Sequence, residues 1–260
     1  MKLLQRLLSN LGKSKDIMRI PPHRLTLRDE GLTLMFGQEE YTEDGFELAR
    51  ANNVKRLILT ELVSEDPELY SFLSRWTFLE FLRIIDSDKR SVSSVQFLSN
   101  LQELHLEDNG GCELLSSAFP NLQRLTFEWS EKRYDLLNHD TISRLCVMYM
   151  KPKAKTWAAK LPSLETLSLF SGNLRSLEPF AASTNLKNLR LSDCRQFEDN
   201  CSLAAFQSLE VVHIQGCPKA VDFEVFNELP ALKRLILTEF KNSPPRSFLR
   251  EDIDVRGLKH

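Results

Sequence analysis

A short pattern of apolar residues recurs nine times along the chain, and this repetition limits the possible fold more than any other feature. Each nine-residue frame has apolar residues at its first, fourth and sixth positions, as in LQELHLEDN, LKNLRLSDC and LKRLILTEF. Successive frames begin 20 to 25 residues apart, which indicates one small structural unit repeated in tandem. The frames begin at Val54, Leu79, Leu101, Leu122, Ile142, Leu164, Leu186, Leu209 and Leu232.

The spacing within each frame predicts a short strand. Side chains at the fourth and sixth positions lie on the same face of a strand, because successive residues alternate between the two faces. A unit of this size cannot bury its leucines alone, so neighbouring units must stack and share one core. The segments between the frames, such as residues 64–76, 112–119 and 222–229, are predicted to be short helices or 3-10 turns. Ser64, followed by Pro67 and Glu68, indicates a helix start.

The frames resemble the motif of the leucine-rich repeat family, L-x-x-L-x-L-x-x-N/C, over residues 51–243. Asn109, Cys194 and Cys217 occupy the ninth position as in the family motif, whereas other frames depart from it there. The resemblance implies an α/β leucine-rich repeat solenoid, curved as a right-handed horseshoe or arc. Its parallel sheet would line the concave face and its short helices or 3-10 turns the convex face, with capped ends.

The two ends of the chain lack the frame and are expected to close the array. Residues 1–50 are predicted to form an N-terminal cap, with a helix marked by leucines 3, 4, 7, 8 and 11. The segment 24–36 is predicted to be a hairpin with a three-residue loop at Asp29, Glu30 and Gly31. Residues 51–243 hold the repeats, and residues 244–260 are predicted to be a C-terminal cap or tail.

Charge and cysteine content favour a soluble intracellular protein. The formal net charge of -2 gives no basic field that would attract nucleic acid or an anionic membrane. Neither a membrane-spanning run nor a secretory signal is indicated, because Arg6 interrupts the first apolar run and no small-residue cleavage site follows it. Five cysteines are an odd number at low density, which indicates reduced thiols and a cytoplasmic location.

Two chemical alternatives fit the sequence less well than this interpretation. Cys194, Cys201, His213 and Cys217 have zinc-binding side chains, but their spacing matches no compact zinc motif. A Cys/His nucleophilic pair requires direct contact, yet the frames place His105 and Cys146 two strands apart, roughly 10 Å. We therefore expect no metal, no cofactor and no enzymatic activity.

The frames also predict which residues form the concave binding surface. Positions three, five, seven and eight are expected to project from it, and repeat proteins commonly bind there. They predict an aromatic and apolar centre next to an acidic patch with interleaved arginines, which suits a protein partner. In the alternative interpretation, the aromatic residues cover the sheet edge or pack against a loop. The candidate partner-binding residues are Arg83, Asp86, Glu103, His105, Glu107, Asp108, Arg124, Glu128, Trp129, Arg144, Met148, Tyr149, Phe170 and Arg190.

These features favour a non-enzymatic protein, monomeric in isolation, that binds another protein on its concave face. By analogy of fold, an inhibitor or immunity-type protein is favoured, since an acidic patch around an aromatic centre would mask a basic active site. The alternatives are a substrate-recognition subunit of a ubiquitin-ligase-type complex, or an enzyme or metalloprotein. The first alternative requires an adaptor-binding domain, for which the 50 residues ahead of the repeats leave little room.

Overall fold

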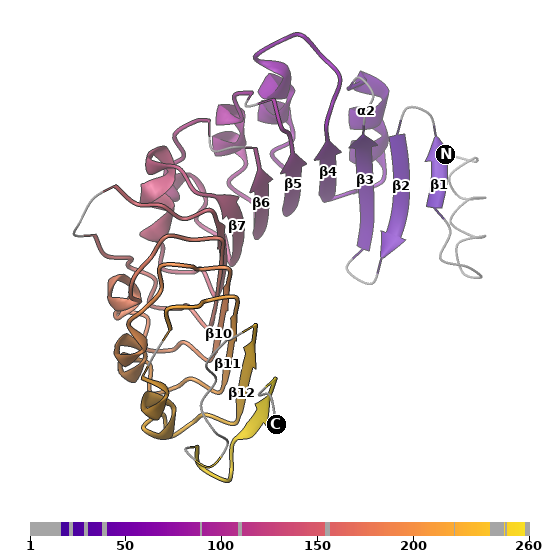
Figure 1. Ribbon diagram of the computed structural model, residues 1–260. Helices are drawn as coiled ribbons and strands as arrows, with labels where there is room; N and C mark the ends of the chain where they lie inside the picture. The colour runs from indigo at the N-terminus through magenta and orange to yellow at the C-terminus, as the bar shows by residue number, and fades with distance from the viewer. Residues whose placement is uncertain are drawn as a thin grey trace.

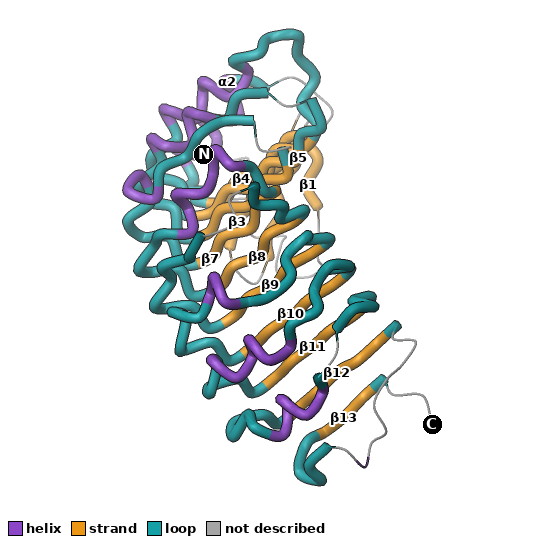
Figure 2. The backbone as a smooth tube through the Cα atoms, turned by 60° about the vertical axis from the view of Figure 1, so that its left-hand side comes forward, coloured by secondary structure: helices purple, strands orange, loops and turns teal. Residues whose placement is uncertain are grey.

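The protein is an arc built around one continuous sheet. The computed structural model describes residues 17–20, 23–28, 31–37, 41–88, 90–108, 111–153, 157–220, 222–239, 247 and 249–257. Its thirteen strands follow one another in the sheet in sequence order. The strands line the inner side of the arc and the short helices its outer side (Figure 1). Figure 2 shows the strands of the repeats stacked side by side along the arc.

The strands of the repeats are short and nearly uniform, whereas the outer face carries one α-helix and seven 3-10 helices among the described residues. The strands are β1 Ile17–Ile20, β2 His23–Arg28, β3 Gly31–Gly37, β4 Arg56–Thr60, β5 Phe81–Ile85, β6 Glu103–Glu107, β7 Arg124–Glu128, β8 Arg144–Met148, β9 Thr166–Phe170, β10 Asn188–Ser192, β11 Val211–Gln215, β12 Arg234–Thr238 and β13 Asp254–Arg256. The helices are α2 Glu43–Ala51, η1 Leu69–Arg75, η2 Ser93–Phe97, η3 Ser116–Ala118, η4 Glu131–Leu137, η5 Glu178–Phe180, η6 Asn200–Ala205 and η7 Phe223–Asn227.

The predicted frame is confirmed by both register and burial. Strands β3 to β13 are parallel, and equal frame positions pair across neighbouring strands, as Leu104 does with Leu125. Leu101, Leu104 and Leu106, the three apolar positions of one frame, have no exposed surface. The fold is therefore the predicted α/β leucine-rich repeat solenoid, with one apolar core running through all the repeats.

The predicted outer segments contain 3-10 helices, one of the two forms expected for them. η1, η3 and η7 lie within residues 64–76, 112–119 and 222–229. The first begins at Leu69, later than predicted, because Ser64 accepts a hydrogen bond from the amide of Asp66 in a turn before the helix. No helix in the described part of the chain is long and apolar enough to cross a membrane.

The N-terminal end contains a helix that the sequence pattern did not single out. α2 has Glu43 and Asp44 in its first turn and Arg50 in its last turn, which complements the helix dipole. Its buried residue Phe46 packs edge-on against Trp76 of the first repeat, with ring centroids 5.3 Å apart. The predicted boundary between residues 50 and 51 thus falls inside this helix. The helix predicted from the leucines at positions 3 to 11 lies outside the described residues.

The hairpin is confirmed, but its loop is shorter than predicted. Arg28 pairs with Gly31, so two residues rather than three separate β2 from β3. Gly31 begins β3 with φ of 115°, a conformation that suits glycine. β3 then pairs in parallel with β4, with Leu34 and Phe36 buried in line with the leucines of the repeats. The predicted cap therefore extends the repeat sheet directly.

The C-terminal segment also continues the sheet. β13 pairs in parallel with β12, placing Val255 beside Leu235 at the fourth position of a frame. This strand was not predicted because Asp252 and Gly257 fall where the frame has apolar residues. Leu249 and Ile253 are buried and cover the last repeat.

Candidate functional site

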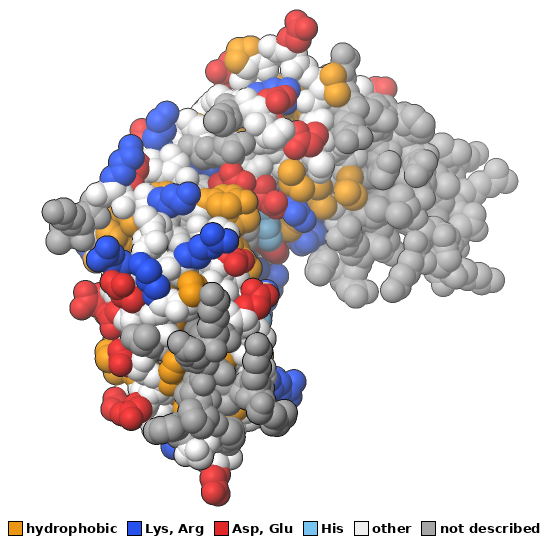
Figure 3. All heavy atoms as spheres, viewed as in Figure 1, with side chains coloured by type: hydrophobic (Ala, Val, Ile, Leu, Met, Phe, Trp, Pro, Cys, Tyr) orange, Lys and Arg blue, Asp and Glu red, His pale blue; other side chains and the backbone are white. Residues whose placement is uncertain are grey.

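The inner side of the arc brings together most of the predicted site residues. On each strand of the repeats, the third, fifth and seventh frame positions face away from the core. Acidic, basic and histidine side chains meet in the inside of the bend (Figure 3). The predicted residues that lie at these positions are Arg83, Glu103, His105, Glu107, Arg124, Glu128, Arg144, Met148, Phe170 and Arg190.

Glu103 is held by two neighbours on this face. His105 Nε2 lies 2.7 Å from Glu103 Oε1, and Arg124 Nη1 donates to Glu103 Oε2 at 3.2 Å. The hydrogen bond from His105 and the nearby positive charges lower the pKa of Glu103, so its carboxylate stays ionised. The negative charge of Glu103 is therefore largely compensated inside the protein.

A second glutamate of β6 is compensated in a similar way. Arg83 donates from Nε and Nη2 to Glu107 Oε1, at 3.1 and 2.7 Å. The pair joins β5 to β6 and fixes both side chains in the sheet surface. A partner at this place would meet a preformed ion pair rather than a free carboxylate.

The concave surface also contains a stacked pair that was not among the candidates. The guanidinium carbon of Arg56 lies 3.9 Å from the ring centre of Phe81, which is 7% exposed. The ring of Phe81 lies 5.5 Å from that of His105. Both Arg56 and Phe81 are at the third frame position, so the frame placed them on the concave face, but the contact between them depends on the strand register.

A hollow of about 400 Å³ lies beside this pair, where strands β3 to β7 begin. It has a polar lining that includes the ion pair between Lys55 and Glu80 and the side chains of Gln102 and Gln123. This hollow was not predicted from the sequence, because most of its lining comes from second and third frame positions of several repeats.

The predicted apolar centre is only partly formed. Met148 pairs with Phe170 in the register of β8 and β9, and the guanidinium carbon of Arg190 lies 5.1 Å from the Phe170 ring centre. Tyr149 follows Met148 in a left-handed conformation with φ of 56°, and its side chain is 53% exposed. Arg144 is exposed at the start of β8, and its side chain has no charged partner among the described residues.

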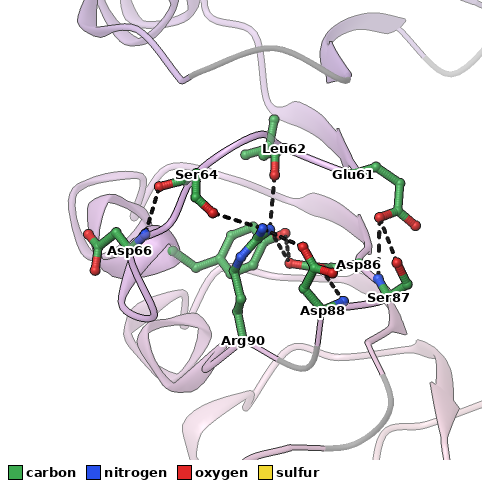
Figure 4. A network of polar contacts seen from close by, with 9 residues as sticks. Glu61, Leu62, Ser64, Asp66, Asp86, Ser87, Asp88 and Arg90 are labelled. Carbon is green, nitrogen blue, oxygen red and sulfur yellow. Dashed lines mark hydrogen bonds and ion pairs between the residues drawn. The ribbon is translucent and has the colours of Figure 1, made fainter.

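Asp86 does not face the concave surface as predicted. It is 1% exposed, accepts a hydrogen bond from Tyr70 Oη at 2.6 Å, and pairs with Arg90 Nη1 at 3.1 Å. Figure 4 shows the Arg90 guanidinium directed at Asp86 and at the backbone carbonyl groups of Leu62 and Ser64. The carboxylate fixes the turn between two repeats and is shielded from any partner on the sheet.

Asp108 is likewise inside the protein. Both of its oxygens accept from the Arg133 guanidinium, with Nη1 at 2.7 Å from Oδ1, and both side chains are fully buried. A buried carboxylate requires such a partner, because an uncompensated charge in the core is strongly unfavourable. The predicted acidic patch therefore loses two of its five members and keeps Glu103, Glu107 and Glu128.

Trp129 is half-buried and packs against the core, as in the alternative interpretation of the aromatic residues. Its ring lies 6.4 Å from that of Trp157, which belongs to the segment following β8, and 6.5 Å from that of Phe127. It supports the outer connection of its repeat and does not join Met148 and Phe170 in an exposed aromatic centre.

The cysteines are spread through the array. Cys194 and Cys217 are buried in neighbouring turns, whereas Cys201 is exposed. No cluster of three or more His, Cys, Asp or Glu side chains suited to a metal ion is present in the described ranges. Cys146 and His105 are separated by Thr126 of β7, and burial raises the pKa of the Cys146 thiol to about 11. A thiol with this pKa is a poor nucleophile at neutral pH.

Comparison with known proteins found solved structures that are partly similar to this chain. No protein-family model matches the sequence. Internalin C2 from Listeria monocytogenes is 19% identical, with 79% of this chain and 80% of that chain covered and a TM-score of 0.47. An internalin (inlF) from the same organism is 18% identical, with coverage of 88% and 87% and a TM-score of 0.37. The functional domain of InlJ, also from L. monocytogenes, is 13% identical, with coverage of 79% and 68% and a TM-score of 0.35.

The chain's own pattern and register decide its classification. Nine frames share one apolar spacing, and their strands pair in parallel with equal positions side by side. The leucines of these frames form one continuous core. The chain therefore has the leucine-rich repeat fold.

Proposed function

We propose that this chain is a non-enzymatic protein that binds another protein with its concave face. The observation that carries the proposal is the surface around β8 and β9, where an exposed tyrosine, Tyr149, borders Met148 and Phe170. Aromatic and methionine side chains at the surface are typical anchors of protein interfaces, since each can bury a large apolar area. The rigid sheet beneath them lets the partner bind without ordering this surface first.

Three further aspects belong to the same proposal. The protein acts as a monomer in isolation and needs no metal or cofactor. Its five cysteines, all free thiols, support a cytoplasmic location. An inhibitor or immunity-type role was expected from the acidic patch, and the burial of Asp86 and Asp108 removes that support. The proposal is therefore limited to protein binding.

The test compares two exposed aromatic residues on opposite faces. The concave variant is Tyr149→Asn with Phe170→Thr, in which asparagine tolerates the left-handed turn and threonine suits a strand. The matched control is Phe97→Ala at the end of η2 on the outer face, where the side chain is 63% exposed. Proteins captured by the wild type from the cells that produce it are identified, purified and titrated against all three forms.

We expect at least one purified partner to lose about 30-fold in affinity for the concave variant, corresponding to ~2 kcal/mol, and to bind the control as tightly as the wild type. The melting temperature of each form shows whether the array is intact. A partner whose affinity falls only with Phe97→Ala, or with neither variant, would contradict binding through the concave face.

A further inference from the structure

The strands that line the concave face carry more basic than acidic side chains, whereas the exposed carboxylates Asp193 and Glu239 lie in the turns beyond the strands. On strands β4 to β12, the third, fifth and seventh positions carry six arginines and three glutamates, an excess of three positive charges. The chain as a whole has a formal net charge of -2. Basic side chains are thus concentrated on the surface assigned to binding. The arginines are Arg56, Arg83, Arg124, Arg144, Arg190 and Arg234, and the glutamates are Glu103, Glu107 and Glu128.

The burial of two aspartates keeps their charges from offsetting this excess. Had Asp86 and Asp108 faced the partner, as the frames suggested, their two negative charges would cancel most of the excess on the strands. Their carboxylates are instead compensated inside the turns by Arg90 and Arg133. Glu103 and Glu107 are paired with Arg124 and Arg83 on the surface itself, and this further reduces the negative charge available to a partner.

Two of the arginines lie near the apolar side chains of Met148, Tyr149 and Phe170 and have no carboxylate partner among the described residues. Arg144 begins β8, the strand that ends in Met148 and Tyr149, and it has no ion pair within the part of the chain that the structure describes. Arg190 lies against the Phe170 ring, and its Nε donates a long hydrogen bond of 3.4 Å to Ser192 Oγ. A guanidinium held over an aromatic ring keeps its donors free for a carboxylate, which it binds through two parallel hydrogen bonds.

We propose that the concave face binds an acidic protein segment in which carboxylates flank an apolar side chain. The apolar side chain would contact Met148, Tyr149 and Phe170, and the carboxylates would pair with Arg144 and Arg190. This inference rests on the proposed protein-binding function and specifies the charge of the partner. The acidic patch expected from the sequence had implied a partner of the opposite charge, a basic one.

Charge complementarity favours an acidic polypeptide over a nucleic acid. Phosphates follow one another closely along a nucleic acid and require an unbroken basic track. Here Glu103, Glu107 and Glu128 interrupt the arginines across β6 and β7. A polypeptide can place its carboxylates opposite the arginines alone and keep them away from these glutamates.

Four fluorescent probes test separately the charge of the partner, its need for apolar side chains and its class, polypeptide or nucleic acid. They are a twelve-residue peptide that alternates Glu with Leu or Phe, the same peptide with Lys in place of Glu, the same peptide with Ser in place of Leu and Phe, and a twelve-nucleotide thymidine strand. Binding to the full chain is measured by fluorescence anisotropy at low and high salt. The variants are Arg144→Glu with Arg190→Glu, the concave variant described above, and the control Arg195→Glu in the exposed turn after β10.

The affinity for the acidic apolar peptide is expected to be at least about tenfold higher than for each of the other probes, and to fall as the salt concentration rises. Arg144→Glu with Arg190→Glu should remove this preference, and Arg195→Glu should leave it unchanged. Tighter binding of the lysine peptide or of the thymidine strand would overturn the proposed sign or class, and so would absence of binding by the acidic peptide. If the lysine peptide binds and is lost with the concave variant, the proposed function stands and only the acidic partner is wrong.

Discussion

The turns that follow the strands differ between two groups of repeats. In the frames that begin at 79, 101 and 122, the eighth residue lies inside the protein or packs against its core, as Asp86, Asp108 and Trp129 do. In the frames that begin at 142 to 232, the eighth residue has a positive φ and faces outward at the turn. The left-handed residues of this second group are Tyr149, Ser171, Asp193, Gly216 and Glu239.

The ninth residue explains the difference. Where it is apolar or glycine, as with Met150, Gly172, Cys194 and Cys217, it is buried and the eighth residue takes the left-handed turn. The first frame obeys the same rule, with Leu62 buried after the left-handed Glu61.

Where the ninth residue is polar, as in the frames with Ser87, Asn109 and Ser130, the eighth side chain packs inward instead. In each turn, one of these two side chains points into the protein. It is the more apolar of the two, or the one whose charge is better compensated by a partner. The composition of the binding surface therefore depends on which of the eighth and ninth side chains of each frame is buried and which is exposed.

The largest expected effect concerns the buried ion pair of the first group. Arg133→Met removes the guanidinium that compensates the buried Asp108 carboxylate and should lower the free energy of unfolding by about 3–5 kcal/mol. The measurement is urea unfolding followed by circular dichroism. The double variant Asp108→Leu with Arg133→Met should recover most of this loss, because it removes both charges. A loss below ~1 kcal/mol in the single variant would show that Asp108 is not buried against Arg133.

A smaller effect is expected at the ninth position, where the two groups can be compared directly. Met150→Ser places a hydroxyl and a cavity in the core and should cost about 2–4 kcal/mol. Ser87→Ala, at the same position of an earlier frame, should change stability by less than ~0.5 kcal/mol because Ser87 is exposed. Equal losses in the two variants would disprove the proposed role of the ninth residue.

The eighth position gives a matched pair of isosteric changes. Asp86→Asn removes the charge that compensates Arg90 and should lower the free energy of unfolding by about 1–3 kcal/mol. Asp193→Asn lies at the exposed, left-handed position of the second group, and asparagine tolerates that conformation, so a change within ~0.5 kcal/mol is expected. Thermal unfolding of both variants measures the difference, and a larger loss for Asp193→Asn would reverse the comparison.

Thiol reactivity tests the burial of the ninth-position cysteines without a substitution that would alter stability. Cys194 and Cys217 should resist iodoacetamide until the chain unfolds, whereas exposed Cys201 should react first. Burial raises the pKa of Cys146 to about 11, so its thiolate fraction and labelling rate should rise about 100-fold from pH 8 to pH 10. Mass spectrometry of labelled peptides gives the rate at each site. Early labelling of Cys194 or Cys217 in the folded protein would refute their inward placement.

The candidate site was predictable wherever it lies on a strand. Glu103, His105 and Phe170 occupy the positions that the frame assigns to the concave face, because the alternation of a strand is fixed by its covalent geometry. The turns were not predictable from the frame alone, since the eighth residue there has two possible orientations. The partners of Asp86 and Asp108 follow them by different intervals, four residues to Arg90 and 25 to Arg133, so no single spacing identified both.

The sequence by itself determined that this protein is a stack of short parallel strands with leucines inside. The apolar side chains of one short repeat are buried only when neighbouring repeats stack on it, and the spacing recurs nine times. The tertiary structure alone decided which charges a partner can meet. Burying two aspartates against Arg90 and Arg133 and pairing two glutamates with surface arginines depend on contacts between repeats. Apart from Asp86 with Arg90, which are four residues apart, these contacts join residues 21 to 25 positions apart, and they determine which charges of the concave face remain available.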